Sequence, residues 1–267
     1  MRSKLFIILN LFTISCLLFF NRCSTDSSIT NGSPPGTCTD FDGNTYETVQ
    51  IGGELWMAEN LKVTHYNNGD PIPTGYSDSQ WGNLSTGAYA VYNNDPALAE
   101  TYGNLYNWYA VDDDHGICPV GWHVPTDEEW MELEMALGMS WEEAHDQSWR
   151  GTDQGSQLAG RADLWTNGAL ENNPAFGSSG FNALPSGSRD YYGSFYGIGS
   201  YGSWWSATET DGSWWSATET DDSWWSATET DTYVAWNRSM RSNYSYVSRY
   251  YFSKELGFSV RCFSPVE

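Results

Sequence analysis

Short runs of alternating apolar and polar residues, separated by turn dipeptides, mark the start of the folded region. Between residues 39 and 61, an Asp-Gly pair at 42–43 and a Gly-Gly pair at 52–53 interrupt the alternation. Because such pairs favour tight turns between strands, the pattern predicts strand, turn, strand, turn, strand. A later alternating run, GFSVRCF at 257–263, predicts a final strand.

One helix is marked at both ends. Thr126 and Glu129 have capping-box spacing, in which each side chain accepts a hydrogen bond from the backbone of the other, and Gly138 supplies a C-terminal stop. The same signature at 140–143 predicts a short second helix. One face of the first helix is apolar, at Trp130, Leu133 and Leu137.

The remaining pattern indicates loops held by aromatic residues. The aromatic segment 102–111 is predicted to be core, and the chain beyond residue 150 is rich in Gly, Ser and Asn. Together these signals predict an α+β fold. We expect a single loop-rich domain at 38–267, with short antiparallel strands and one or two helices.

The N-terminal part of the chain has a different composition. Two basic residues and a mostly apolar run to Phe20 are typical of a bacterial export signal, which we place at 1–23. Cys16 and Cys23 are lipidation candidates, and Cys23 opens a polar run that suits a tether. Residues 24–37 predict a flexible linker. The expected location is the cell surface or outer membrane, as a lipoprotein, or the medium, as a secreted protein.

Charge narrows the choice of partners. The chain has 12 basic and 34 acidic residues and a formal net charge of −22. This argues against nucleic acid, whose binding needs Lys and Arg to displace counterions, and against direct contact with anionic membranes. Any membrane contact would then be made through a lipid anchor.

The sequence offers little sign of a cofactor or a catalytic motif. The run DFDGN at 40–44 resembles part of a calcium loop, but the further ligands and flanking helices are missing. We therefore expect a turn there and no cofactor, with calcium as the alternative. No G-x-S-x-G, H-E-x-x-H, P-loop or C-x-x-C occurs. The histidines have no metal-site spacing and are expected to be structural or solvated, at His65, His115, His123 and His145.

A ten-residue unit occurs three times in tandem, at 202–211, 212–221 and 222–231. Identity over so short a period indicates recent duplication. Because neighbouring strand residues face opposite ways, we expect the fold to take one Trp-Trp pair, from the first or third copy, with one ring in the core and one outside. The surplus residues should form an exposed hairpin or loop, which is either a sticky binding surface or an accident of duplication.

Tryptophan rings beside polar groups are suited to packing on sugar faces, although most aromatic residues in such a domain serve as core. The candidate ligand-binding residues are Trp204, Trp205, Trp214, Trp215, Trp224, Trp225, Trp236 and Asn237.

Six ordered motifs carry a family resemblance over roughly 38–263. They are CTDFDGNTYETVQIGGELWMAENLKV, YGNLYNWYAV, ICPVGWHVPTDEEW, GFNALPSGSRDYYGSFYGIGSYGSWWSATE, AWNRSM and GFSVRC. Together they resemble the Fibrobacter succinogenes major paralogous domain (FISUMP) family of exported bacterial proteins and lipoproteins. The resemblance implies a surface or secreted protein, with adhesion or carbohydrate binding as the suspected role. The tandem insertion departs from the family pattern, which has a single WWSATE-like block.

The same motifs are more distantly similar to C-type-lectin-like and formylglycine-generating-enzyme domains, which implies a loop-rich fold with its termini close together. The lectins bind calcium through an E-P-N loop and a W-N-D triplet. Here the nearest match is Trp236-Asn237-Arg238, with Arg in place of the carboxylate. The enzymes need a late pair of cysteines, of which this chain has only Cys262. We therefore do not expect this chain to bind sugar through the calcium site of the lectins or to perform the catalysis of the formylglycine-generating enzymes.

Export would place the domain in an oxidising compartment, and lectin-like folds set the segment before the first helix beside the last strand. The resemblance therefore implies a disulfide between Cys118 and Cys262, with Cys38 as the odd cysteine. The alternative is that all three are reduced and buried.

Two function classes follow. The first is a non-catalytic exported module that binds a glycan or another surface protein. The alternative is an extracellular carbohydrate-active hydrolase, or another enzyme, that uses carboxylates brought together by loops. The oligomeric state stays open.

Overall fold

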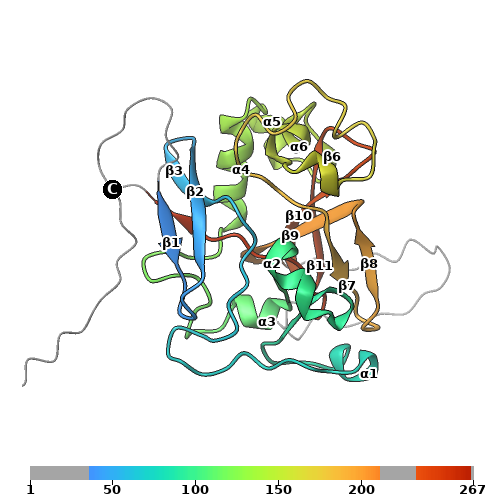
Figure 1. Cartoon of the computed structure of the whole chain (residues 1–267). Helices are drawn as coiled ribbons and strands as arrows, with labels where there is room; N and C mark the ends of the chain where they lie inside the picture. Colours follow the sequence, from blue (N-terminus) through green and yellow to red (C-terminus); the bar gives the residue numbers. More distant parts are fainter. Residues whose placement is uncertain (1–35, 211–232, 266–267) are drawn as a thin grey trace, which may run out of the picture.

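The computed structural model describes residues 36–210 and 233–265, and it has an α+β architecture with two main sheets (Figure 1). The first sheet is antiparallel, in the order β1-β2-β3-β12. Its strands are β1 (Thr37–Thr39), β2 (Thr45–Ile51), β3 (Glu54–Met57) and β12 (Phe263–Ser264). Both predicted turns are confirmed, because 42–43 lies between β1 and β2 and 52–53 lies between β2 and β3.

The second sheet has the order β6-β11-β10-β9-β7-β8. Its strands are β6 (Ser148–Arg150), β7 (Ser186–Arg189), β8 (Phe195–Ile198), β9 (Tyr201–Thr210), β10 (Val234–Arg241) and β11 (Val247–Ser253). Neighbours are antiparallel except β7 and β9, which are parallel. A further small sheet consists of β4 (Tyr89–Ala90) and β5 (Leu105–Tyr106).

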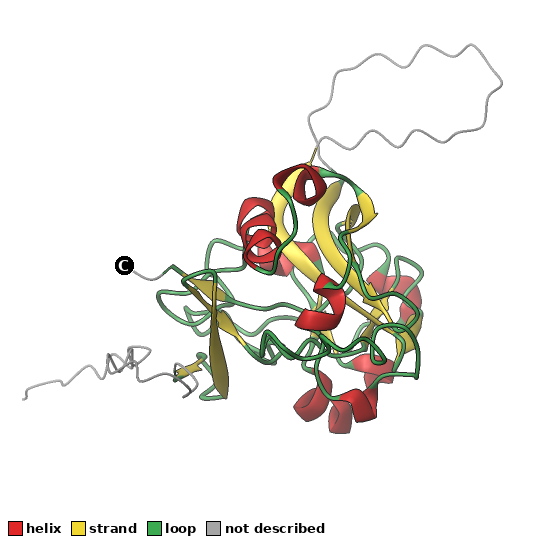
Figure 2. Cartoon of the chain, turned by 90° about the horizontal axis from the view of Figure 1, so that it is seen from above, coloured by secondary structure: helices red, strands yellow, loops and turns green. Residues whose placement is uncertain are grey.

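The described helices are short, and much of the chain between elements is loop (Figure 2). They are α1 (Asp78–Trp81), α2 (Ala99–Tyr102), α3 (Trp108–Val111), α4 (Asp127–Ala136), α5 (Trp141–His145) and α6 (Gln154–Leu158), with 3-10 turns at Tyr92–Asn94, Pro96–Leu98 and Ala162–Leu164. The capping boxes predicted for α4 and α5 are confirmed. None of these helices is long and apolar enough to cross a bilayer.

Strand β9 contains residues 202–210 of the first decapeptide copy, and its residues 202–206 are buried on both faces. Trp204 packs in one apolar cluster with Trp130 of α4, and Trp205 packs in a second cluster with Tyr106 and Phe258. The two indoles are 1% and 0% exposed. The expectation that one ring would lie outside is therefore wrong, because α4 covers one face of the sheet and the segments around Tyr106 and Phe258 cover the other.

Several predictions fall on residues that the structure does not describe. Residues 211–232 include the second and third copies, so Trp214, Trp215, Trp224 and Trp225 lie outside the described residues. The same is true of the export signal at 1–23, its candidate cysteines and most of the linker at 24–37. These assignments stay predictions.

The segment 257–263 is not one continuous strand. It makes isolated bridges in turn to Arg189, Tyr106 and Trp204, and only its end joins β12. All of its residues are buried. The alternation predicted a strand with one exposed face, whereas the segment passes through the interior and exchanges hydrogen bonds with a different element every few residues.

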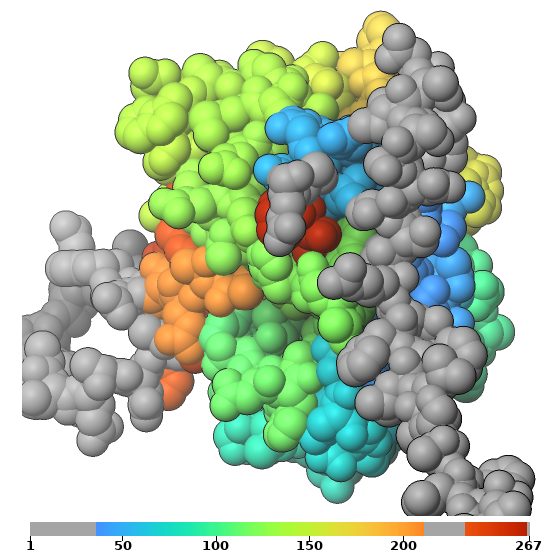
Figure 3. All heavy atoms as spheres, turned by 90° about the vertical axis from the view of Figure 1, so that its left-hand side faces the viewer, coloured from blue at the N-terminus to red at the C-terminus, as the bar shows by residue number. Residues whose placement is uncertain are grey.

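The disulfide between Cys118 and Cys262 is present, with a Cα–Cα distance of 5.7 Å. It joins the segment before α4 to the segment before β12. Strand β12 itself pairs with β3, and its first residue, Phe263, bridges to His123. Figure 3 shows the end of β12 in red, between β1–β3 in blue and the green segment near α4. Cys38 is buried in the same apolar cluster as the two disulfide-bonded cysteines.

Candidate functional site

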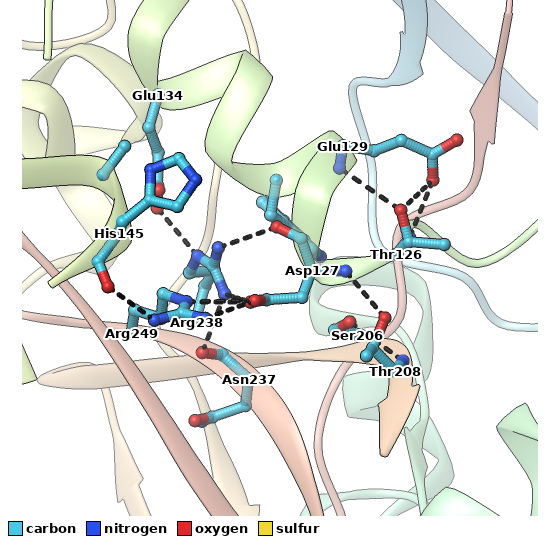
Figure 4. Close-up of polar contacts among 12 residues, drawn as sticks. Thr126, Asp127, Glu129, Glu134, His145, Ser206, Thr208, Asn237, Arg238 and Arg249 are labelled. Atoms are coloured by element: carbon cyan, nitrogen blue, oxygen red, sulfur yellow. Dashed lines mark hydrogen bonds and ion pairs between the residues drawn. The ribbon is translucent and has the colours of Figure 1, made fainter. Parts of the chain in front are cut away.

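A dense group of paired charges lies where α4 meets β10 and β11 (Figure 4). The capping box at Thr126 starts the helix, and the next residue, Asp127, faces inward. Its carboxylate accepts hydrogen bonds from Arg238 Nη1 at 2.6 Å and from Arg249 Nη2 at 2.6 Å. Two turns farther along α4, Glu134 accepts from Arg238 Nε at 2.8 Å and pairs with Arg150.

Burial and ion pairing shift the pKa values of these groups in opposite directions. Burial alone would raise the pKa of Asp127, but the hydrogen bonds from Arg249 and the charge of Arg238 outweigh it and hold that pKa below its ordinary value. Burial lowers the pKa of Arg150 to about 10, so this guanidinium stays charged at neutral pH.

This ion network holds the fold together. Each carboxylate oxygen of Asp127 and Glu134 already accepts from a guanidinium. Both carboxylates are also buried. A general acid or nucleophile must reach its substrate, so this cluster does not make a catalytic pair. Its ion pairs connect α4 to strands β10 and β11 of the six-stranded sheet.

The other face of the same sheet contains a cavity of about 500 Å³. Because strand residues alternate between faces, Arg238 faces α4, whereas Asn237, Ser239 and Arg241 face away from it. The cavity lies on that opposite face, at the start of β9 and the end of β10. Residues that define it include Tyr196, Tyr201, Arg241, Phe252, Ser188 and Asn243.

A buried polar group fixes one wall of the cavity. The Tyr201 hydroxyl lies 2.8 Å from Ser203 Oγ and 3.0 Å from Ser239 Oγ. Asn237 Nδ2 donates to the same two oxygens, at 2.9 and 3.0 Å. These bonds hold the Tyr201 ring in one position. The Asn237 Oδ1 atom is buried and has no hydrogen-bond partner among the residues that the structure describes.

Arg241 stands at the end of β10 beside this wall. Its guanidinium lies 5.5 Å from the centre of the Tyr201 ring and 5.7 Å from that of Trp149 on β6. The side chain is exposed, in contrast to Arg238 and Arg249 on the other face. Aromatic rings on both sides attract the cation and limit its motion.

The structure places the four described candidates for ligand binding in the interior. Trp204, Trp205 and Asn237 are fully buried, and Trp236 is nearly so, under the Arg249 guanidinium at 3.8 Å. Their rings are core because the sheet is covered on the α4 face and over most of the other. We therefore do not include these four residues among the contacts of the site. Asn237 contributes only indirectly, because it donates to the two serine hydroxyls that contact the Tyr201 hydroxyl.

Sequence reasoning missed the residues that line the cavity. Tyr196 and Tyr201 belong to a Gly- and Tyr-rich stretch that predicts loops, and Arg241 follows the motif AWNRSM. The one available signal was the concentration of tyrosine at 191–201. Nothing local indicates that this stretch, β10 and β11 meet around a cavity, because their contacts join distant parts of the chain.

The described histidines and the Asp-Gly turn all have protein partners. His65 pairs with Asp42, His115 with Asp113 and His123 with Glu129. The Asp40 carboxylate accepts from the backbone of Asn44, which closes the predicted turn. Within the described ranges, no three His, Cys, Asp or Glu side chains are grouped as metal ligands. Calcium binding stays the alternative prediction.

Comparison with known proteins identifies the family. Residues 49–263 match the Fibrobacter succinogenes major domain, and the chain therefore belongs to that family. Neither the curated proteins nor the solved structures gave a match.

Proposed function

We propose that this member of the Fibrobacter succinogenes major domain family is a non-catalytic, exported binding module that holds a saccharide in the cavity beside β9 and β10. The observation that carries the proposal is the cavity itself. It is of ligand size and combines aromatic rings with hydroxyl and amide groups. Those are the two kinds of contact that a sugar needs.

The lining residues supply both kinds of contact. Tyr196 is 53% exposed, so its ring face is available to the C–H face of a sugar. Ser188 and Asn243 offer donors and acceptors to sugar hydroxyls. Tyr201 is held by its bonds to Ser203 and Ser239, which lowers the entropy lost on binding.

The hydrolase alternative has less support. Glycoside hydrolysis ordinarily uses two carboxyl groups that flank the bond to be broken. None of the residues that line the cavity is Asp or Glu, and the carboxylates of Asp127 and Glu134 are buried in ion pairs on the opposite face of the sheet. The cavity therefore favours binding over hydrolysis.

Export and a lectin-like architecture belong to the same proposal. Residues 1–23 would be the signal, and Cys23 is the lipidation candidate. The disulfide supports export because such bonds persist in oxidising compartments. The lectin-like architecture is supported by the first and last described strands sharing one sheet.

A glycan array probed with the purified protein, with and without calcium, tests the proposal. We expect a reproducible saccharide hit, and we expect Tyr196→Ala to weaken it by several-fold to about tenfold, the worth of one lost ring contact. The matched control is Tyr192→Ala, an exposed tyrosine that does not line the cavity. An array without hits, or turnover of any polysaccharide, would contradict the proposal.

A further inference from the structure

Arg241 differs from the other basic side chains of the described residues. Seven of those form ion pairs with Asp or Glu, namely Lys62, Arg150, Arg161, Arg189, Arg238, Arg249 and Lys254. Arg261 is fully buried and donates to Asn60 and to main-chain carbonyls. Arg241 is exposed, has no ion pair among the described residues, and makes ring contacts to Trp149 and Tyr201.

That Arg241 has no carboxylate partner within residues 36–210 and 233–265 is informative in so acidic a chain. With 34 acidic residues against 12 basic ones, an exposed arginine has many carboxylates to choose from. Arg241 is instead held by aromatic rings, which contact a guanidinium without occupying its N–H donors. The donors of Arg241 are therefore available at the edge of the cavity.

The polar groups of the cavity indicate which ligand group the Arg241 donors would bind. A guanidinium binds a carboxylate through two parallel hydrogen bonds. The cavity has no acidic lining residue to repel such a group, and its other polar contacts are hydroxyl and amide groups. A ligand that bears both a carboxylate and several hydroxyls satisfies all of them.

We infer that the cavity takes an acidic saccharide, of the uronic acid class, whose carboxylate pairs with Arg241. The net charge of −22 opposes any anionic partner, but no lining residue of this cavity is acidic, so the nearest charge that the ligand meets is the Arg241 guanidinium. The inference rests on the proposed saccharide-binding function and names its substrate class. The rings of Tyr196 and Tyr201 contact the sugar face, and Asn243 and Ser188 contact its hydroxyls.

Calorimetry on the full-length protein tests this with oligomers of galacturonate, mannuronate and guluronate, each paired with its methyl ester. The ester keeps the sugar and removes the charge. We expect at least one acid to bind about tenfold or more tightly than its ester. Arg241→Gln should remove that preference and leave ester binding intact, while Arg241→Lys should keep part of it. Arg161→Gln is the control, because Arg161 is exposed, pairs with Asp163 and lies outside the cavity.

The outcomes separate the two proposals. If esters and neutral glycans bind as tightly as acids, or if Arg241→Gln weakens acid and ester alike, the acidic-ligand inference is wrong and saccharide binding stands. If no saccharide binds, charged or neutral, both proposals fail. Equal binding of a poly-glutamate peptide and the best uronate would also overturn the inference, since it would show that the sugar contributes nothing.

Discussion

Three consecutive acidic residues at the start of α4 have three different roles. Asp127 is buried between Arg238 and Arg249, Glu128 is exposed, and Glu129 completes the capping box and pairs with His123. The capping signal marks where the helix begins. Which of the three carboxylates turns inward depends on where β10 and β11 place their arginines.

Asp127→Asn should lower the free energy of unfolding by about 3–5 kcal/mol, because it leaves the buried Arg249 guanidinium without its anion and removes one of the two carboxylates that pair with Arg238. Chemical denaturation followed by tryptophan fluorescence measures it. Glu128→Gln is the matched control on the same turn, and a change within about 0.5 kcal/mol is expected for this exposed residue. Equal effects of the two substitutions would show that the ion network contributes little.

Asp127 also predicts a pH dependence. Its folded pKa is depressed below the ordinary 3.8, so its stabilising effect is fully present above that value and is lost as the pH falls through the folded pKa. Below about pH 4, the free energy of unfolding should therefore fall more steeply in the native protein than in Asp127→Asn. Denaturation curves collected between neutral pH and strong acid give the two slopes, and parallel slopes would refute the assignment.

At the scale of one strand, β9 shows why the decapeptide has its composition. Trp204 Nε1 donates to Asn60 Oδ1 at 2.9 Å, and Trp205 Nε1 donates to the Tyr106 carbonyl at 2.8 Å. The Thr208 hydroxyl accepts from the Asp127 backbone at 3.0 Å, at the start of α4. One copy of the unit thus joins the sheet to α4 and to the core on both sides.

Gly202 distinguishes the copies. A Cβ at this position would lie 2.5 Å from the Leu184 carbonyl oxygen and 2.5 Å from Trp204 Cη2. The first and second copies begin with Gly, whereas the third begins with Asp222. The strand therefore has no room for the first residue of the third copy, and the first copy is the one seen in β9.

Two deletions test this with a single-residue difference. Removing 212–231 leaves three residues between Thr210 and Val234, which pair across β9 and β10, and this suits a hairpin. Removing 202–221 leaves the same chain except that Asp222 takes the place of Gly202. We expect the variant without 212–231 to keep its cooperative thermal unfolding. The variant without 202–221 should be less stable by about 1–3 kcal/mol, because the side chain of Asp222 overpacks the site of Gly202. Equal melting temperatures would disprove the steric argument.

At the scale of the whole molecule, two apolar clusters lie on opposite sides of β9 and share its backbone. Adjacent tryptophans, Trp204 and Trp205, each enter one of them. Disrupting either cluster should therefore disturb the strand that supports the other. This arrangement predicts one cooperative unit, not two layers that melt separately.

Trp204→Ala and Trp205→Ala should each lower the free energy of unfolding by about 3–5 kcal/mol, the range for large-to-small core changes. Both should do so within a single transition. Far-ultraviolet circular dichroism and fluorescence, followed during the same melt, check for coincidence. Trp141→Ala is the control because that ring is 61% exposed, and its cost should stay below about 1 kcal/mol. Separate transitions by the two probes would contradict a shared core.

What the sequence determined by itself is local. The turns at 42–43 and 52–53, the capping boxes at Thr126 and Ser140, and the stop at Gly138 all depend on residues within a few positions of one another, and all are present in the structure. The disulfide was implied only through family resemblance, because its cysteines are 144 residues apart.

Tertiary structure alone decided the site. A tryptophan pair has the same local signal whether one or both faces of its strand are covered, so burial of Trp204 and Trp205 could not be inferred from alternation. The neighbours of Arg241 come from β6 and β9, far away in the chain. Side-chain pairing across such separations depends on the path of the whole backbone, whereas turns and caps depend on the backbone of a few residues.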